Sequence, residues 1–143
     1  MTTINTYLTF KGTCEAAFNL YKSVFGGELQ TFSRFEDMPP NPDAPLSAEM
    51  KKHVMHVTLP IGENTLMGSD AGGEWSPNLI KGTNYSISLG LESQENADQV
   101  FAELSEGGQV TMPKDNTFWG DYFGMCTDQF GIQWMINAAK RRV

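Results

Sequence analysis

The sequence predicts an α+β protein built from two β-α-β-β-β modules that follow one another along 143 residues. Two observations favour this fold class. A helix-like run ending in a double glycine occurs twice, as EAAFNLYKSVFGGEL from Glu15 and as ENADQVFAELSEGGQV from Glu95. One strand-like run precedes each helix, and three follow it. Because this order is repeated, we expect a single domain with module 1 at about residues 1–75 and module 2 at about 83–139.

The first module begins with INTYLTF, residues 4–10, whose alternation of apolar and polar residues is typical of a half-buried strand. In the helix that follows, apolar residues recur at the spacing of one helical face, at Ala17, Leu20, Tyr21 and Val24. Thr13 is a predicted N-cap, and Gly26 and Gly27 supply the left-handed residues that end a helix. Three more strands are predicted at 29–35, 54–59 and 65–69.

Residues 36–52, EDMPPNPDAPLSAEMKK, interrupt the first module with four prolines and four acidic residues. Proline lacks the N–H group that a central strand needs, so this segment is predicted to be a loop. Two interpretations stay open, a mobile surface loop and a lid over a binding cleft.

The second module repeats the pattern after the connector SPNLIKG, residues 76–82. Its first strand is NYSISLGL, residues 84–91, and its helix has Ser93 as predicted N-cap and Gly107 and Gly108 at its end. The apolar face of this helix is formed by Ala97, Val100, Phe101 and Leu104. The remaining strands are predicted at 109–112, 122–127 and 132–136.

Composition and charge exclude several functions. A hydrophobic content of 40% and a charged content of 19% are typical of a globular protein. The net charge of −7 argues against a nucleic-acid partner, because the only basic cluster, Lys140-Arg141-Arg142, is expected to be a solvated tail. No apolar run reaches the roughly 18 residues of a membrane span, and the N-terminus does not resemble a signal peptide. Cys14 and Cys126 lie far apart and are expected to be reduced, which favours a cytoplasmic location.

Four segments resemble the PhnB-like branch of the vicinal oxygen chelate superfamily, which includes glyoxalases, bleomycin resistance proteins and dioxygenases. They are YLTFKGTCEAAFNLYKSVFGGEL, VMHVTLPIGENTLMGSDA, LSEGGQVTMP and TFWGDYFGMCTDQFGIQWMIN. This branch is sometimes labelled 3-demethylubiquinone-9 3-methyltransferase-like. The resemblance implies a glyoxalase/bleomycin resistance-like fold, in which each module curls its mixed sheet into half of a cleft with the helix outside. It also implies a homodimer.

Strand alternation then predicts which side chains face the cleft. The predicted inner positions are Asn5, Tyr7 and Thr9; Val54, His56 and Thr58; Thr65, Met67 and Ser69; Ser86, Ser88 and Gly90; and Gln133, Met135 and Asn137. The side chains predicted to pack on the helices are Leu8 and Phe10; Met55, Val57 and Leu59; Tyr85, Ile87, Leu89 and Leu91; and Ile132, Trp134 and Ile136.

The resemblance also places the four metal-ligand positions of the superfamily at or near Asn5, Met67, Ser86 and Met135. Amide, hydroxyl and thioether groups are weak ligands for a hard divalent cation, so no metal is predicted at the usual place. Strand alternation sends His53 and His56 to opposite faces, so the two cannot chelate together. A displaced site that joins His56 to Asp70 or Asp121 stays open as an alternative.

His56 and Asp121 are the candidate catalytic residues. His56 is the inner residue that titrates near neutral pH and could act as a general base, although the pattern also fits a structural histidine bonded to a backbone carbonyl or to water. Asp121 follows Trp119-Gly120, where it could aim into the cleft or cap a turn. Asp128 begins the turn DQFG, and we expect it to bond backbone N–H groups there.

Aromatic residues could stack on a planar ligand or fill a dimer interface, and both interpretations stay open for Trp75, Phe118, Trp119 and Tyr122. The sequence has no glycine-rich cofactor loop and no nucleophile elbow, so no cofactor is predicted.

The leading hypothesis is a metal-independent, PhnB-like protein that binds an unidentified small molecule as a homodimer. Its predicted ligand-binding residues are Asn5, Tyr7, Met67, Ser86, Ser88, Trp119 and Met135. The alternative is an isomerase or lyase of glyoxalase type that uses His56 as general base, with or without a displaced divalent metal. A third hypothesis is a scaffold whose cleft no longer binds a ligand.

Overall fold

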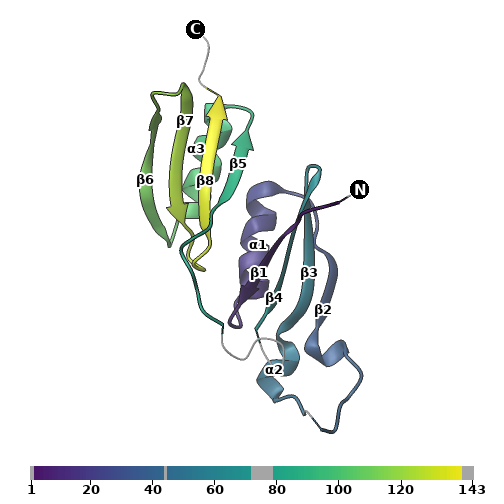
Figure 1. Ribbon diagram of the computed structural model, residues 1–143. Helices are drawn as coiled ribbons and strands as arrows, with labels where there is room; N and C mark the ends of the chain where they lie inside the picture. Colours follow the sequence, from purple (N-terminus) through teal and green to yellow (C-terminus); the bar gives the residue numbers. More distant parts are fainter. Residues whose placement is uncertain (1, 44, 72–78, 140–143) are drawn as a thin grey trace. The chain divides into compact units, whose positions relative to one another are not determined.

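The computed structural model describes residues 2–43, 45–71 and 79–139 (Figure 1). Trp75 and the basic cluster at 140–142 therefore lie outside the described residues. The chain divides into two compact units, Met1–Ile80 and Lys81–Val143, and each unit holds one four-stranded sheet. No helix in the described ranges is long and apolar enough to cross a membrane.

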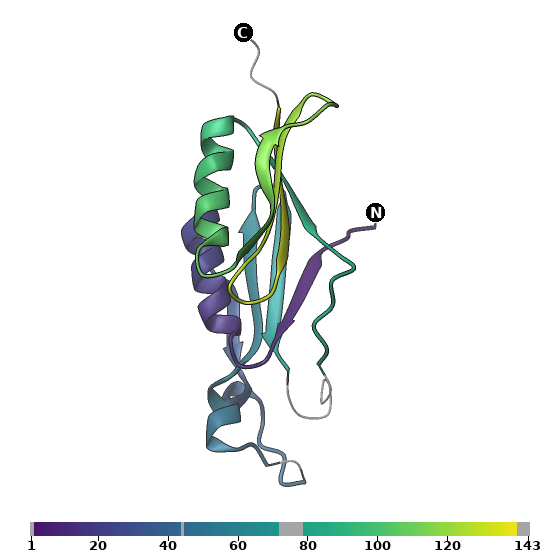
Figure 2. The same ribbon diagram turned by 90° about the vertical axis from the view of Figure 1, so that its left-hand side faces the viewer.

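The first sheet has the strand order β1-β4-β3-β2. Its strands are β1 (Thr6–Phe10), β2 (Gln30–Arg34), β3 (Val54–Ile61) and β4 (Asn64–Asp70), and its long helix is α1 (Cys14–Phe25). Strand β1 runs parallel to β4, whereas β3 is antiparallel to both β4 and β2. Helix α1 packs on β3 and β4 and covers one face of the sheet (Figure 2).

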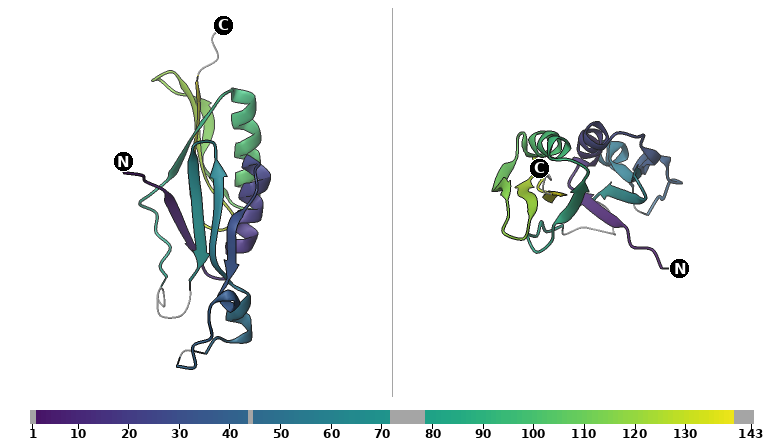
Figure 3. Two further views of the ribbon diagram at one scale, coloured as in Figure 1. Left: turned by 90° about the vertical axis from the view of Figure 1, so that its right-hand side faces the viewer. Right: turned by 90° about the horizontal axis from the view of Figure 1, so that it is seen from above.

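The second sheet repeats this topology, with the order β5-β8-β7-β6. Its elements are β5 (Ile87–Leu91), α3 (Gln94–Ser105), β6 (Gln109–Asn116), β7 (Asp121–Thr127) and β8 (Gln133–Ala139). The pair β5–β8 is parallel and the other pairs are antiparallel. The predicted β-α-β-β-β order is therefore confirmed in both units, and in each unit the long helix covers one face of its own sheet (Figure 3).

The apolar faces of the helices supply the core of each unit. All four residues predicted for the face of α3, Ala97, Val100, Phe101 and Leu104, are buried. In α1 the buried residues are Cys14, Ala17, Phe18 and Tyr21, so the predicted face was wrong for Leu20 and Val24. The predicted face and the observed face of α1 have the same i, i+3, i+4, i+7 spacing. The observed face includes the large Phe18 ring, so burying it removes more apolar surface from water. Trp134 is buried as predicted.

The caps of the two helices differ. Ser93 caps α3, because its hydroxyl accepts the Asn96 N–H at 3.0 Å. Thr13 occupies the N-cap position of α1 as predicted, but its side chain makes no capping hydrogen bond. Instead, the Asp70 carboxylate at the end of β4 accepts the Cys14 N–H at 2.9 Å.

The segment predicted as a loop at 36–52 contains two short helices, η1 (Phe35–Asp37) and α2 (Ala48–Lys52), which corrects that prediction. The Ser47 hydroxyl accepts the Met50 N–H and caps α2. Arg34 holds the base of the segment, since its guanidinium donates to both carboxylate oxygens of Glu15 and to the Lys52 carbonyl.

Several strand predictions also need correction. Strand β5 begins at Ile87 rather than at residue 84, and Tyr85 is exposed rather than packed on the helix. Val54 is fully buried rather than open to the inner face. Arg34 pairs with Val54 and Ser33 with His56, so β3 has one extra residue at Met55, and this bulge reverses the alternation at the start of the strand. Strand β6 extends to Asn116 rather than Met112, and its Pro113 is tolerated because β6 is an edge strand.

Candidate functional site

The face of the first sheet opposite α1 carries the candidate base His56. Its Nε2 atom lies 3.1 Å from the Thr58 hydroxyl. The Tyr7 ring from β1 lies 5.9 Å from the His56 ring, at a tilt of 33°. Both Tyr7 and Thr58 are register partners of Met67, so three strands contribute to one row on this face. His56 is half-buried and hydrogen-bonded, which is compatible both with a positioned base and with a structural histidine.

Thr31 belongs to the same polar group, although no sequence pattern predicted it there. Its hydroxyl donates to the Thr58 hydroxyl at 2.8 Å, which links Thr31, Thr58 and His56 in one chain of hydrogen bonds. Thr31 has a φ of +47°, a left-handed conformation that a β-branched residue rarely adopts. The strained residue lies where the β2–β3 register shifts, between Gln30 and Ser33. A bulge of this kind leaves no signature in the alternation of TFS.

The corresponding face of the second sheet is apolar rather than polar. Its central row runs from β5 to β6 through Ser88, Met135, Met125 and Met112, each of which is the register partner of the next. Met135 and Met125 are half-buried and Met112 is 37% exposed. Met135 was predicted on this face; Met125 could have been found from the alternation of YFGMCT, whereas Met112 lies next to a register shift.

Asn5 and Ser86 lie just before β1 and β5 and are exposed. The residue that pairs with the central methionine lies two positions later in each unit. Tyr7, rather than Asn5, pairs with Met67, and Ser88, rather than Ser86, pairs with Met135. The two units thus repeat the same register.

The aromatic residues near the β6–β7 turn separate into two groups. The Phe118 and Trp119 rings pack edge to face at 5.0 Å, and Trp119 contacts Phe123 at 5.9 Å. Phe118 is 97% exposed and Trp119 is 53% exposed.

Tyr122 belongs to the helix side of the sheet instead. Its hydroxyl donates to Asp98 of α3 at 2.6 Å, and Lys114 binds the same carboxylate oxygen. The Asp98 carboxylate, as hydrogen-bond acceptor, raises the pKa of Tyr122 to about 12, so the phenol stays protonated at neutral pH.

Asp121 starts β7, and its backbone is tied to Thr117. The Thr117 hydroxyl donates to the Asp121 carbonyl at 2.8 Å, and Asp121 N–H donates back to that hydroxyl at 3.2 Å. These bonds close the β6–β7 turn through the side chain of Thr117. Asp121 and His56 belong to different units.

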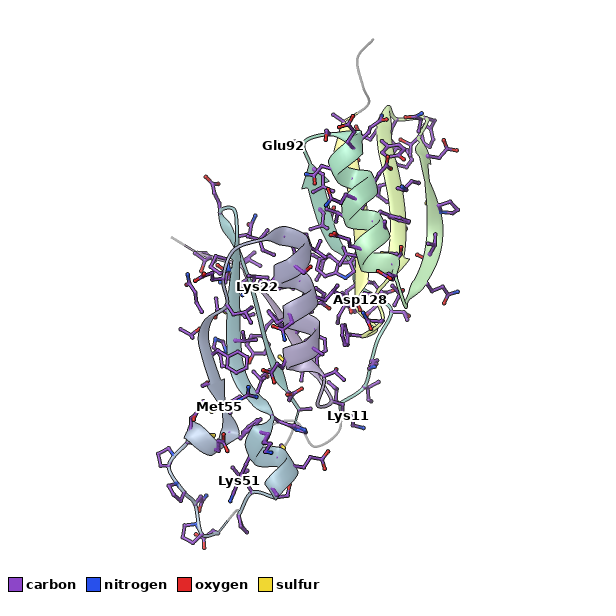
Figure 4. The ribbon with its side chains drawn as sticks, turned by 180° about the vertical axis from the view of Figure 1, so that it is seen from behind. Lys11, Lys22, Lys51, Met55, Glu92 and Asp128 are labelled. Atoms are coloured by element: carbon purple, nitrogen blue, oxygen red, sulfur yellow. The ribbon has the colours of Figure 1, made fainter. Side chains whose placement is uncertain are left out.

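Two buried carboxylates have structural partners. Asp128, in the turn between β7 and β8 (Figure 4), accepts the N–H groups of Phe130 and Ile132 and the Trp134 indole N–H, as its turn position predicted. Asp70 accepts the Val54 N–H at 2.8 Å in addition to that of Cys14. Burial, followed by the charge of Asp70, raises the pKa of the Cys14 thiol. Burial likewise raises the pKa of the Cys126 thiol to about 11.

The residues at the metal-ligand positions of related folds do not fit a hard divalent cation. Asn5, Met67, Ser86 and Met135 offer neutral oxygens and thioethers. The alternative that joins His56 to Asp70 is not favoured either, because both Asp70 oxygens accept backbone N–H groups on the helix side of the sheet. Across the described ranges, no three His, Cys, Asp or Glu side chains form a group that could hold a metal ion. His53 ends α2 rather than sharing a regular strand with His56.

Comparison with known proteins places this geometry in a family. A family model described as 3-demethylubiquinone-9 3-methyltransferase matches residues 2–137. Protein YjdN of Escherichia coli (strain K12) is 29% identical over 147 residues, which cover 97% of each chain.

Solved structures agree with this match. Protein PA1353 from Pseudomonas aeruginosa is 39% identical with a TM-score of 0.83, over 99% of this chain and 100% of that one. PhnB protein from Bacillus cereus is 26% identical with a TM-score of 0.74, over 96% of this chain and 100% of that one. The fosfomycin resistance protein FosX from Listeria monocytogenes shares the fold alone, with 11% identity and a TM-score of 0.62, over 99% of this chain and 94% of that one.

Proposed function

Because the chain belongs to the 3-demethylubiquinone-9 3-methyltransferase family, as a PhnB-like member of the vicinal oxygen chelate superfamily, we propose that it binds a small organic molecule without a metal ion. The expected ligand contacts are those of the sequence prediction, Asn5, Tyr7, Met67, Ser86, Ser88, Trp119 and Met135. The name of the family does not extend the proposal to methyl transfer. The β1–α1 turn contains only one glycine, Gly12, and the Asp70 carboxylate already bonds the N-terminus of α1, where a phosphate-bearing cofactor would otherwise be held.

The observation that carries the proposal is the row formed by Met112, Met125 and Met135 on the helix-free face of the second sheet. Methionine side chains are flexible and polarizable, so a row of three gives an apolar surface that adapts to the shape of an organic ligand. Small-molecule sites are mostly apolar, with few polar groups. Ser88, at the β5 end of the row, supplies such a polar group.

A ligand screen tests the proposal. Protein labelled with carbon-13 at the methionine methyl groups is titrated with a library of small organic compounds. We expect binding compounds to shift the signals of Met112, Met125 and Met135, which are assigned from single Met→Leu variants. Met125→Ser is expected to weaken binding about tenfold, because it removes apolar contact area. Met50→Leu, on α2 in the other unit, is the matched control and should leave the affinity unchanged.

Two results would contradict the proposal. If no compound shifts any methionine signal, the third hypothesis of a non-binding scaffold gains support. If protein purified without chelator or added metal holds a near-stoichiometric divalent ion, metal independence is wrong.

A second function, an isomerase or lyase with His56 as general base, is favoured by the hydrogen bond between His56 and Thr58 and by the adjacent Tyr7 ring. A neutral imidazole positioned in this way can take a proton from a carbon acid. Once a substrate is found, His56→Gln should abolish turnover while ligand affinity is retained. The same test on Asp121→Asn decides whether Asp121 participates. Unchanged turnover in His56→Gln would eliminate the base.

The homodimer and the cytoplasmic location remain part of the proposal. The exposed rings of Phe118 and Trp119 support an interface between two copies, because exposed aromatic side chains are enriched at such surfaces. Sedimentation of the wild type and of a Phe118→Ser/Trp119→Ser double variant tests the dimer, and a monomeric wild type would refute it. Fractionation of the source cells tests the location.

A further inference from the structure

Next to the methionine row, the helix-free face of the second sheet carries a second row, which includes the predicted inner positions Gly90 and Asn137. Gly90 of β5 pairs with Asn137 of β8, and Asn137 pairs with Phe123 of β7. Asp115 of β6, the register partner of Phe123, completes the row at the sheet edge. A glycine, an amide and an aromatic ring therefore lie side by side.

The Asn137 amide has an unsatisfied group. Its Oδ1 atom is buried and has no hydrogen-bond partner among the residues that the structure describes. Buried polar atoms in folded proteins nearly always have a partner, because leaving one unpaired is costly. An amide oxygen kept unpaired within a sheet face is therefore available to accept a hydrogen bond from a molecule that binds there.

Gly90 leaves room for such a molecule. A Cβ atom built at this position would meet no atom within 4 Å, so the space above the strand is open. Its backbone does not have the positive φ that would require glycine, unlike Gly107 and Gly131. A glycine in the middle of a strand without a backbone reason is typical of a place where a ligand approaches closely.

The opposite neighbour of Asn137 provides an aromatic wall. The Phe123 ring is half-buried and packs against Trp119 at 5.9 Å, with an interplanar angle of 67°. The methionine row adjoins it through Met125 and Met135. Such surroundings suit a flat ring. They disfavour an anion, since the nearest charge in the row is the carboxylate of Asp115.

We infer that Gly90, Asn137 and Phe123 form a subsite for a planar aromatic molecule that carries an uncharged N–H or O–H donor. The ring lies over Gly90 and against Phe123, and the donor bonds Asn137 Oδ1. The inference rests on the proposed function and deepens it, because it names the chemical class of the ligand.

Indole and 1-methylindole form a matched pair of probes, since methylation removes the donor and keeps the ring. Each is titrated into the full chain by calorimetry and by the methionine-methyl signals. We expect indole to bind about 5- to 10-fold more tightly, the contribution of one hydrogen bond. In Asn137→Leu the ratio should fall to about one through weaker indole binding, and Gly90→Val should weaken both probes by filling the open space. Glu95→Gln, on the exposed first turn of α3, is the control and should change neither affinity.

A thermal readout keeps the test independent of the ligand. Asn137→Leu removes an unpaired buried oxygen, so its melting temperature should equal or exceed that of the wild type. A lower melting temperature would mean that the amide has a structural partner, and the subsite would be wrong. Equal affinity of the wild type for the two probes, or binding of other compounds but of neither indole, would overturn the subsite and leave the proposed function intact. Absence of binding by every compound would overturn both.

Discussion

Replacement of Asp70 by alanine should destabilise the first unit more than any exposed substitution. Asp70 is 4% exposed, and its carboxylate joins two elements that are distant in sequence. One oxygen accepts the Cys14 N–H at 2.9 Å, at the start of α1, and the other accepts the Val54 N–H at 2.8 Å, at the start of β3. Asp70→Ala leaves both N–H groups buried without a partner.

The magnitude follows from these two bonds. A buried donor left unpaired costs about 1–3 kcal/mol, so the loss of two predicts a decrease of about 2–6 kcal/mol in the free energy of unfolding. This is a large part of the roughly 5–15 kcal/mol that stabilises an ordinary domain. Asp70→Asn keeps one acceptor oxygen and should lose about half as much. This milder variant is informative if the alanine variant fails to fold.

Urea denaturation followed by far-ultraviolet circular dichroism measures the effect. Asp43→Ala is the matched control, because Asp43 is exposed; its substitution should change the free energy by less than about 0.5 kcal/mol. If Asp70→Ala stays within the same limit, the carboxylate does not hold α1 to β3 and the reasoning is refuted. If the two units unfold in separate transitions, destabilisation of the transition of the first unit alone would further support this role of Asp70.

Three other predictions concern local contacts. Asp98→Asn should lower the pKa of Tyr122 from about 12 toward the ordinary value, as followed by phenolate absorbance, and an unchanged titration would contradict the bond. Because this folded pKa is raised, the stabilisation is present below pH ~10 and is lost as the pH rises through about 12. Gly68→Ala should cost about 1–3 kcal/mol in thermal unfolding, since its Cβ would lie 2.5 Å from Phe18 Cε2, and a neutral result would refute this packing. Arg34→Lys should speed limited proteolysis within residues 36–52 by losing the two-fold bond to Glu15, and equal cleavage rates would argue against that anchor.

Periodic sequence patterns correctly predicted which side chains of a helix or strand are buried, where burial follows from the spacing of apolar residues alone. The spacing of Ala97, Val100, Phe101 and Leu104 predicted the buried face of α3, and strand alternation predicted that Trp134 is in the core. These residues are apolar at a regular period, so one sequence is enough to assign them. The element order of both modules was found in the same way.

What failed depends on contacts between distant segments. Thr13 has the chemistry of an N-cap, but Asp70, 56 residues away from Cys14, provides the acceptor instead. Val54 is buried because a bulge reverses the strand phase, and no residue type announces that bulge. The left-handed Thr31 and its bond to Thr58 were missed for the same reason.

Because the two sheets share one register, equivalent positions of the first and second unit can be compared within a single chain. Thr58 in the first sheet and Met125 in the second occupy equivalent places, because each pairs with the central methionine of its β4 or β8 strand. Two residues earlier along the same strands stand His56 and Phe123. Exchanging the pair His56/Thr58 with the pair Phe123/Met125 would place polar side chains on the apolar face of the second sheet and apolar side chains on the polar face of the first. The backbone pairing of each sheet would be kept. A property that moves with the exchanged pair can then be attributed to these side chains.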